Sequence, residues 1–583
     1  MVDDVPTTQA DAVPTDALDG AADPGEPGDP ADPVVQSRRA GRRHPVRATV
    51  ATTLACLLVL FALLLPDRLD RLSPGVFLRL PIEALILTGL FLALPTGALR
   101  LRRWLAALAG VGLGLLTIVK LLDMGFYEVF VRPFDPLLDF PLAGNGLDFL
   151  KDSYGETASI GAAVAIVLLI VALLVLMTWA VLRLTRLVVR HRATAGSAVA
   201  VLGVAWVALA VLGTQIVQYT PVASRNAAAL TYRHLRQLPE DIEDSREFAD
   251  ESKVDAFQNT PNDQLLTGLK GKDVVVAFVE SYGRTAVESP EMGPGIDKVL
   301  DDGSQQLRTA GYASRSGWLT SPTAGGGSWL AQSTLMSGLW IKNQKRYDKF
   351  IASDRTTLNG YFKRADFRTL AVAPGVKKDW PEARVFGFDK IYAAHTLGYQ
   401  GPKFSWSWMP DQYVLSEFER TEHAPEHAPM MAEIPLTSSH MPWTPLPSLV
   451  DWKDVGDGSV FAPMATATGA KDSLYRNGPQ VRARYAQSVR YTLSTLISYV
   501  QKYGDDDMVL VFLGDHQPIP LVAGQNASHD VPITIVAKDP AVLDRVADWG
   551  WTDGLKPAPK APVWPMSDFR DKFLTAFGPQ GGR

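Results

Sequence analysis

Cysteine is nearly absent from this sequence. The only one among the 583 residues is Cys56, which lies inside an apolar segment. A single cysteine excludes both a disulfide framework and a zinc site built from several cysteines within one chain. A domain outside the cytoplasm would therefore have to fold without disulfides, and the chain after residue 217 is long enough to build a sufficient hydrophobic core.

An excess of positive charge is absent as well. Lys and Arg number 57, Asp and Glu number 62, and the formal net charge is −5. Proteins that bind nucleic acid usually carry a basic face. The composition therefore gives no support for a nucleic-acid partner.

Long apolar runs are confined to the first 217 residues, and the remainder has the mixed polarity of a soluble domain. Five apolar segments, each near the ~20 residues that cross a hydrocarbon core, lie at 48–65, 76–94, 104–122, 159–182 and 195–217. Arg79 and Pro81 make the second segment the least regular. We predict five transmembrane helices in residues 41–217, which serve either as an anchor alone or as a lateral access route for a lipid substrate.

The arginines indicate how these helices are oriented. Twelve lie before the first segment, between the second and third, and between the fourth and fifth: Arg38, Arg39, Arg42, Arg43, Arg47, Arg100, Arg102, Arg103, Arg183, Arg186, Arg190 and Arg192. The other loops hold four basic residues: Arg68, Arg71, Arg132 and Lys151. By the positive-inside rule the N-terminus is cytoplasmic, and five spans place everything after Val217 outside the cytoplasmic membrane. Residues 1–40, rich in Asp, Pro, Ala and Gly, are predicted to be a disordered cytoplasmic tail rather than a signal peptide.

The chain after residue 217 is predicted to begin with a connector at 218–268, made of short helices near the membrane surface. The domain proper spans 269–583. Asp273–Val279 and Met508–Gly514 are short apolar runs typical of strands buried on both faces. Further strands are expected at 367–372 and 531–536, with a helical pattern before residue 508. Alternating strands and helices predict an α/β domain with a mainly parallel central sheet.

Polar side chains follow two of these strands directly. Glu280 comes after the first, and Asp515 and His516 come after the second. Ligands of open α/β sheets bind at the carboxyl ends of strands, so we expect these three side chains to converge. Either acid alone would more often be a turn residue or a helix cap. Together with the histidine they form a ligand set suited to Mn²⁺, Zn²⁺, Mg²⁺ or Ca²⁺.

A glycine-rich turn supplies a candidate nucleophile. In the run Ser321–Gly338, the hydroxyl of Ser328 stands where glycines 325–327 meet a helix start. A metal ion beside Ser328 would lower the pKa of its hydroxyl and offset charge on a phosphoryl or sulfuryl oxygen. Thr323 is the alternative nucleophile. His440, in a Pro-flanked loop, would bind a substrate oxygen or protonate a leaving group, although a lone histidine is more often structural.

In this order the motifs resemble those of the alkaline phosphatase/sulfatase superfamily, and within it the membrane-anchored lipoteichoic acid synthase-like sulfatase branch. The matching elements are Glu280-Ser281, Leu335-Met336-Ser337-Gly338, Ser438-Ser439-His440-Met441-Pro442 and Gly514-Asp515-His516. The resemblance implies an alkaline phosphatase-like fold over about Asp273–Lys538. It also implies one divalent cation, most often Mn²⁺, bound by Glu280, Ser328, Asp515 and His516.

The sequence departs from this branch at several points. The synthases use threonine as the nucleophile, and this chain has Ser328. Many soluble sulfatases use a modified cysteine, which is excluded here because Cys56 lies in the membrane part. Trp380 and Arg384 are the candidates for binding the substrate phosphate, at a shorter spacing to the following Gly-Phe-Asp than in the synthases, and Arg384 could equally be a surface residue. Arg284 and His529 are further candidates, and the loop Tyr399–Asp411 is expected to form a pocket wall.

The sequence thus predicts an enzyme at the outer face of the cytoplasmic membrane that transfers or hydrolyses a phosphoryl or phosphoglycerol-type group. The resemblance implies a phosphatidylglycerol-like head group as donor and a glycolipid or cell-envelope glycan as acceptor. One alternative is a sulfuric ester hydrolase. An alternative of another class is a catalytically silent envelope protein that binds a partner. A transporter is not supported, because few paired charges or broken helices occur within the spans.

Overall fold

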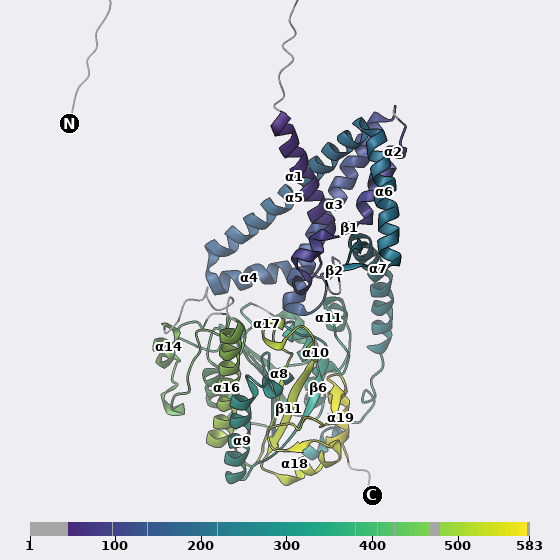
Figure 1. Cartoon of the computed structure of the whole chain (residues 1–583). Helices are drawn as coiled ribbons and strands as arrows, with labels where there is room; N and C mark the ends of the chain where they lie inside the picture. The colour runs from purple at the N-terminus through teal and green to yellow at the C-terminus, as the bar shows by residue number, and fades with distance from the viewer. Residues whose placement is uncertain are drawn as a thin grey trace, which may run out of the picture. The chain divides into compact units, whose positions relative to one another are not determined.

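The structure is a computed structural model, and it describes residues 45–579 apart from 96, 137, 141, 218–219, 379, 405, 425 and 467–477 (Figure 1). The predicted tail at 1–40 lies outside the described residues. From Thr52 onward the chain forms one compact unit, which begins inside the first helix.

Among the described residues, four helices are long and apolar enough to cross a membrane. They are α1 (Pro45–Leu64), α3 (Leu99–Phe130), α5 (Glu156–Arg190) and α6 (Arg192–Val211). The predicted second span is instead a 3₁₀ turn at Pro74–Leu78 followed by α2 (Ile82–Ala93), which has 12 residues. At ~1.5 Å per residue this helix covers about 18 Å, less than the ~30 Å of a hydrocarbon core. The helix starts late because Pro81 disfavours a helical conformation at the residue before it.

Two buried basic residues of α3 bind the ends of neighbouring helices. Lys120 donates from Nζ to the carbonyls of Ala62 and Leu63, at 2.9 and 3.1 Å, at the end of α1. Arg102 donates to the carbonyls of Leu94 and Pro95, just after α2. Carbonyls at a helix end lack partners within the helix, so these side chains satisfy them.

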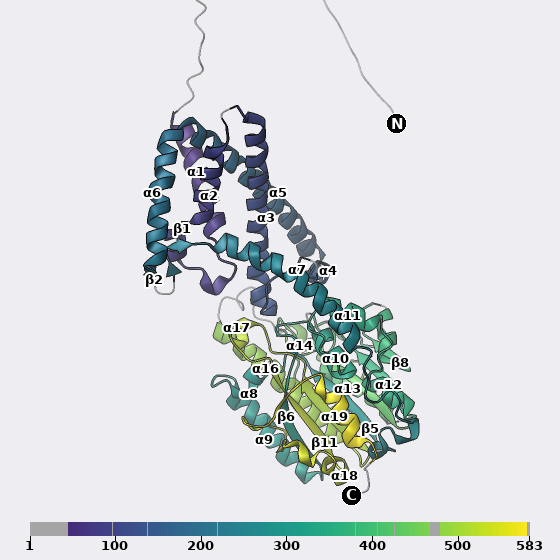
Figure 2. The same cartoon turned by 90° about the vertical axis from the view of Figure 1, so that its right-hand side faces the viewer.

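Two further helices lie outside the apolar set. Between α3 and α5 the chain forms α4 (Leu142–Tyr154), and after α6 it forms α7 (Asn226–Glu251). The connector was predicted to consist of short helices, but most of it is α7, one helix of 26 residues (Figure 2), followed by short 3₁₀ helices at Asn262–Gln264 and Thr267–Leu269. Pro239 lies inside α7 without ending it.

A nine-stranded mixed sheet forms the centre of the α/β domain. Its strands run in the order β12 (Thr552–Asp553), β6 (Ala313–Thr320), β11 (Asp530–Ala537), β10 (Met508–Gly514), β5 (Asp273–Val279), β9 (Met430–Leu436), β7 (Arg368–Ala373) and β8 (Lys390–Ala393), and β13 (Val563–Pro565) pairs with β6.

The strands from β10 to β8 are parallel, as expected, but β11 is antiparallel to both β10 and β6. The run at 531–536 is therefore a strand of this sheet, as predicted, but it runs opposite to its neighbours, and the sheet is mixed. Only the short helix α17 (Pro520–Ala523) separates β10 from β11. A parallel neighbour would need a longer crossover.

Strand β5 is buried on both faces. Val275, Ala277 and Val279 contribute to a core shared with α9 (Gly293–Thr309) and α16 (Gly478–Tyr503). Val274, Val276 and Phe278 contribute to the opposite core, shared with α10 (Ser328–Ser337), α12 (Leu358–Arg364) and α19 (Asp568–Phe577). The helices on both faces, visible in Figure 2, explain why this strand is apolar throughout.

The remaining elements are short. The helices are α8 (Arg284–Glu288), α11 (Gln344–Ile351), α13 (Asp411–Phe418), α14 (Ala462–Thr466) and α18 (Pro540–Asp544). Two small strand pairs are β1 (Leu80–Pro81) with β4 (Ala223–Ser224), and β2 (Gln215–Val217) with β3 (Thr220–Pro221).

Candidate active site

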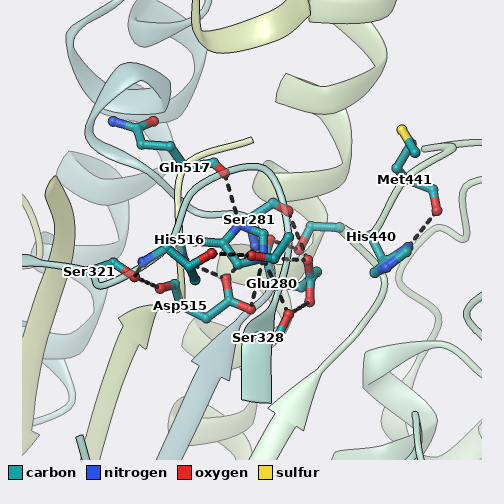
Figure 3. A network of polar contacts seen from close by, with 12 residues as sticks. Glu280, Ser281, Ser321, Ser328, His440, Met441, Asp515, His516 and Gln517 are labelled. Carbon is teal, nitrogen blue, oxygen red and sulfur yellow. Dashed lines mark hydrogen bonds and ion pairs between the residues drawn. The ribbon is translucent and has the colours of Figure 1, made fainter. Parts of the chain in front are cut away.

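Two neighbouring parallel strands bring three ionisable side chains together. The pairing of β5 with β10 places Val279 opposite Gly514, so Glu280 and Asp515 leave the sheet at the same edge. Ligand atoms of Glu280, Asp515 and His516 all lie within 4.8 Å of one another, and the three residues are buried (Figure 3). Glu280 and Asp515 are 235 positions apart in the sequence, and the pairing of β5 with β10 brings them together.

The turn after β5 is held close to the end of β10. A Cβ on Gly514 would lie 1.8 Å from the carbonyl oxygen of Tyr282, so only glycine fits there. Ser281 takes a left-handed conformation, with φ of 58°, and its backbone N–H donates to Asp515 Oδ1 at 2.7 Å. The hydroxyl of Tyr485, on α16, donates to the carbonyl of Ser281 at 2.7 Å. Sequence reasoning named Ser281 only as part of the Glu280-Ser281 motif and gave Tyr485 no role in the site, since neither contributes a ligand atom.

His516 presents a lone pair to the cluster. Its Nδ1–H donates to the carbonyl of Gln517 at 2.8 Å, which leaves Nε2 as the acceptor nitrogen. Nε2 lies 3.5 Å from Glu280 Oε1 and 3.7 Å from Asp515 Oδ2. A neutral imidazole fixed in this way is the form that binds a metal ion.

The electrostatics of the cluster suit a cation. Burial, and next the carboxylate of Glu280, raise the pKa of Asp515 well above its usual value. Burial alone would lower the pKa of His516, but the carboxylates of Asp515 and Glu280 raise it. Among the described residues, no Lys or Arg forms an ion pair with either carboxylate. Two oxygen ligands and one nitrogen ligand without a basic counter-charge fit a divalent metal ion.

The hydroxyl of Ser328 reaches this cluster. Ser328 is the first residue of α10, after Gly327 in a left-handed conformation with φ of 84°. Its Oγ–H donates to Glu280 Oε2 at 3.0 Å, and the same oxygen lies 3.3 Å from His516 Nε2 (Figure 3). The hydroxyl of Thr323 instead donates to the carbonyl of Gly326 at 2.6 Å. Of the two candidate nucleophiles, Ser328 is therefore the one beside the carboxylates.

The end of α3 packs against the glycine-rich turn that carries Ser328. A Cβ on Gly325 would lie 1.5 Å from the carbonyl oxygen of Val129, and one on Gly326 would lie 3.0 Å from the ring of Phe130. The N–H of Gly325 donates to the carbonyl of Gln517 at 2.8 Å. Because these two glycines have no side chain, the loop after β10 and the end of α3 can both lie against the turn that carries Ser328.

His440 lies at the edge of the same network (Figure 3). Its Nδ1–H donates to the carbonyl of Met441 at 2.5 Å, so Nε2 is the acceptor. Its ring stacks on Trp406 with centroids 3.7 Å apart. Burial lowers the pKa of His440 to about 4, and the imidazole is therefore neutral near neutral pH. This state suits acceptance of a hydroxyl proton rather than protonation of a leaving group.

The other predicted substrate contacts lie elsewhere. The ring of Trp380 packs 5.6 Å from that of Phe386, and Arg384 is exposed. Arg284 pairs with Glu288 and Asp530, and His529 offers its backbone carbonyl to Ser321. In the contacts of the described residues, none of these four side chains touches a residue of the Glu280 cluster.

Sequence reasoning also missed Lys377. Its Nζ lies 5.0 Å from the ring of Trp406, on which His440 stacks. The available signals were the tryptophans of the loop Tyr399–Asp411 and the paired lysines 377–378 that follow a strand end.

Comparison with solved structures gives matches of low identity. The lipoteichoic acid synthase LtaP from Listeria monocytogenes is 15% identical, with 58% of this chain and 79% of that chain covered and a TM-score of 0.36. The membrane-integral lipooligosaccharide phosphoethanolamine transferase A from Neisseria meningitidis is 15% identical, with 90% and 95% covered and a TM-score of 0.40. The phosphoglycerol transferase GacH from Streptococcus pyogenes is 13% identical, with 57% and 90% covered and a TM-score of 0.32. With TM-scores this low, these similarities support no further argument.

Sequence comparison is more specific. No curated protein matches the chain. Residues 273–531, however, match the family model described as Sulfatase, from the strand before Glu280 to the start of β11. The matched region contains Glu280, Ser328, His440, Asp515 and His516. The part of the chain that is similar to the sulfatase family therefore contains all five residues of the candidate site.

Proposed function

We propose that this protein is a membrane-anchored, metal-dependent phosphoryl or phosphoglycerol-type transferase or hydrolase that uses Ser328 as its nucleophile. One observation carries the proposal. The Ser328 hydroxyl lies 3.0 Å from Glu280 Oε2 and 3.3 Å from His516 Nε2, where three buried ligand atoms converge at the edge of the sheet.

Glu280, Asp515, His516 and Ser328 would hold one divalent cation, for which Mn²⁺ is our first choice and Mg²⁺, Zn²⁺ and Ca²⁺ are alternatives. When bound, such an ion lowers the pKa of a neighbouring hydroxyl and offsets charge on a phosphoryl oxygen. The donor set of two carboxylates and one imidazole supports a site of this kind.

The residues then divide the reaction into two steps. Ser328 loses its proton along the hydrogen bond to Glu280, and Oγ bonds to phosphorus while the bond to the leaving alcohol breaks. The leaving oxygen takes a proton from solvent. In the second step, water or an acceptor hydroxyl gives its proton to His440 Nε2 and bonds to phosphorus while the bond from phosphorus to Ser328 Oγ breaks. Ser328 Oγ takes back the proton held by Glu280, and His440 gives its proton to solvent. The Nδ1–H of His440, bound to the Met441 carbonyl, leaves Nε2 free for this task.

We further propose that the site acts at the outer face of the membrane on a lipid head group as donor and an envelope glycan or glycolipid as acceptor. Four candidate membrane helices in the same chain support a substrate held in the bilayer. The contact of α3 with the glycine-rich turn at 325–326 supports a nucleophile close to the membrane surface.

This orientation requires five crossings, and residues 80–94 supply the fifth in our proposal. At one end of this stretch, β1 pairs with β4, which follows α6 and the strands β2 and β3. At the other end, Arg192, the first residue of α6, donates to the carbonyls of Leu92 and Leu94. Because one end of the stretch is bonded to the start of α6 and the other end is paired with β4, which follows α6, these contacts support a crossing antiparallel to α6.

The test uses the full-length protein in detergent with Mn²⁺ and chromogenic phosphodiester, phosphomonoester and sulfate esters. We expect cleavage of the phosphodiester and loss of that activity in Ser328→Ala. Cleavage of the sulfate ester alone would favour a sulfuric ester hydrolase. No turnover of any ester, nor of lipid donors in membranes, would favour the catalytically silent envelope protein.

A further inference from the structure

Helix α4 contacts the candidate active site through one face. Asp148 and Asp152, one helical turn apart, pair with Lys378 and Lys377. Phe149, between them, has its ring centroid 6.4 Å from that of His440. These residues belong to the segment between two apolar helices, α3 and α5, whereas their partners belong to the α/β domain.

Lys377 is enclosed by aromatic rings as well as by Asp152. Its Nζ lies 5.0 Å from the centroid of Trp406 and 5.6 Å from that of Trp408. Its side chain is only 17% exposed, and that of Asp152 is 26% exposed. An ammonium group held between a carboxylate and two rings has little freedom to move.

Trp406, which Lys377 contacts, also contacts His440. Trp406 stacks on it at 3.7 Å with an interplanar angle of 13°, and Nδ1 is bound to the Met441 carbonyl. The direction of the free Nε2 is therefore set by Trp406, by the Met441 carbonyl and by the nearby Phe149. A chain of direct contacts leads from Asp152 through Lys377 and Trp406 to His440.

We propose that Asp152 and Lys377 are positioning residues, through which α4 fixes the orientation of His440 for the second step of the reaction. The inference rests on the proposed function, in which His440 accepts a proton from water or the acceptor. A small displacement of a proton acceptor slows the step that it serves. Loss of the Asp152 carboxylate should therefore slow release of the phosphoryl group from Ser328 more than its transfer to Ser328.

The neighbouring pair supplies a matched control. Asp148 and Lys378 lie on the same helix and the same loop, but their side chains are 60% and 82% exposed. Among the ring contacts of the described residues, Lys377 and Lys403 stand over the two tryptophans and Lys378 does not. Exposed ion pairs contribute little to stability. Asp148→Asn therefore removes one ion pair between α4 and the loop but leaves the contacts from Asp152 through Lys377 and Trp406 to His440 in place.

The experiment compares full-length Asp152→Asn, Lys377→Met, Lys377→Arg and Asp148→Asn in detergent with Mn²⁺ and a chromogenic phosphodiester. We expect kcat to fall roughly 10-fold or more in Asp152→Asn and Lys377→Met, with KM little changed. Mass spectrometry should show phosphorylated Ser328 accumulating in both. Lys377→Arg keeps the charge over the ring and should retain activity, and Asp148→Asn should match the wild type. Equal metal content and equal thermal stability in all variants establish that the fold is intact.

Wild-type turnover in Asp152→Asn and Lys377→Met would overturn the inference while leaving the proposed function standing. A lower kcat without phosphorylated Ser328 would do the same, because it would indicate a structural effect on both steps. A wild-type protein that neither turns over an ester nor forms phosphorylated Ser328 would overturn the proposed function itself.

Discussion

At the scale of single residues, the hydrogen-bond partner of each polar atom decides which side chains can act in the site. The hydroxyls of Ser328 and Thr323 lie five positions apart on one glycine-rich turn, yet they have different partners. Thr323 donates to a backbone carbonyl, and Ser328 donates to a buried carboxylate. The same reasoning applies to the two histidines, whose Nδ1–H groups donate to carbonyls, so that Nε2 is the acceptor nitrogen in each.

Ser328 and Thr323 make a direct test of the nucleophile. Ser328→Ala should abolish the covalent phospho-enzyme that mass spectrometry detects after brief exposure to substrate, because no other hydroxyl of the turn is bound to Glu280. Thr323→Ala should still form the phospho-enzyme, although loss of its bond to Gly326 would loosen the turn. If only Thr323→Ala lacked the modification, the assignment of Ser328 would be wrong.

Metal binding should depend on pH through Asp515. Its pKa is raised by burial and by Glu280, so a proton occupies the apo site at a pH where an ordinary aspartate has lost it. A metal ion must displace that proton, and affinity should therefore fall as the pH is lowered from about 8 to about 5. Calorimetry in buffers of different ionisation enthalpy would measure the released protons. Binding without proton release near neutral pH would contradict this assignment.

Glu433 offers a stability test away from the site. Burial raises the pKa of this β9 residue to about 7, and its partner Asn359 donates to Oε2 while the buried Oδ1 of Asn359 has no partner among the described residues. The unfolded chain loses the proton near the ordinary pKa of about 4.3 and the folded chain only near 7, so stability falls as the pH rises between them.

Glu433→Gln stays neutral at every pH and can donate to Asn359 Oδ1. We expect its Tm, measured by intrinsic fluorescence of the detergent-solubilised chain, to exceed that of the wild type by about 5 °C at pH near 8 and by much less at acid pH. Glu426→Gln, at an exposed position, should show no such pH-dependent gain. An equal shift at both pH values would argue against a buried carboxyl as the cause.

At the scale of elements, the residues at the ends of helices and strands determine which distant segments can contact one another. Gly514 lets the turn after β5 pass the end of β10, and Gly325 lets the end of α3 reach the nucleophile turn. Both are packing requirements between segments far apart in the chain. Helix α10 then begins directly at Ser328, so the element boundary and the reactive residue coincide.

Gly325→Ala should separate close packing from backbone strain. Gly325 and Gly524 both have positive φ, 76° and 89°, but a Cβ on Gly325 would meet the Val129 carbonyl at 1.5 Å and one on Gly524 would meet nothing within 4 Å. We expect Gly325→Ala to lose most of the esterase activity with metal still bound, and Gly524→Ala to lose little. Similar activities in the two variants would indicate that α3 does not constrain the turn.

At the scale of the whole molecule, the apolar helices and the α/β domain are connected by more than helix α7. Segments 129–130 and 148–152 contact the nucleophile turn and the neighbourhood of His440. These contacts require both segments to lie on the same side of the bilayer as the α/β domain, and they therefore constrain the membrane topology.

Topology has its own test. A reporter that is active only outside the cytoplasm, fused after Val217, should be active if residues 80–94 cross the membrane and the N-terminus is cytoplasmic. The reversed charge bias supplies the control, because moving arginines from the predicted cytoplasmic loops to the others should reduce the signal. Activity of a cytoplasmic reporter at the same position would place the catalytic domain on the other side.

Local chemistry in the sequence was sufficient for much of this description. Apolar runs of the right length predicted α1, α3, α5 and α6. Short apolar runs rich in β-branched residues predicted β5, β7 and β10, because a strand buried on both faces is apolar throughout. Strand ends carrying Glu280, Asp515 and His516 marked the cluster. These features depend on residues close together in the chain.

Tertiary structure alone decided the rest. No local pattern in the sequence gives the direction of β11 or the continuity of α7 through Pro239. Trp380 and Arg384 were candidates by resemblance, despite a shorter spacing, but Trp380 packs on Phe386 and Arg384 is exposed. Asp152, Lys377 and Trp406 instead meet beside His440 from three distant segments. The physical reason is that periodicity and burial are local properties, while side-chain contacts between remote segments are set by how the elements pack in three dimensions.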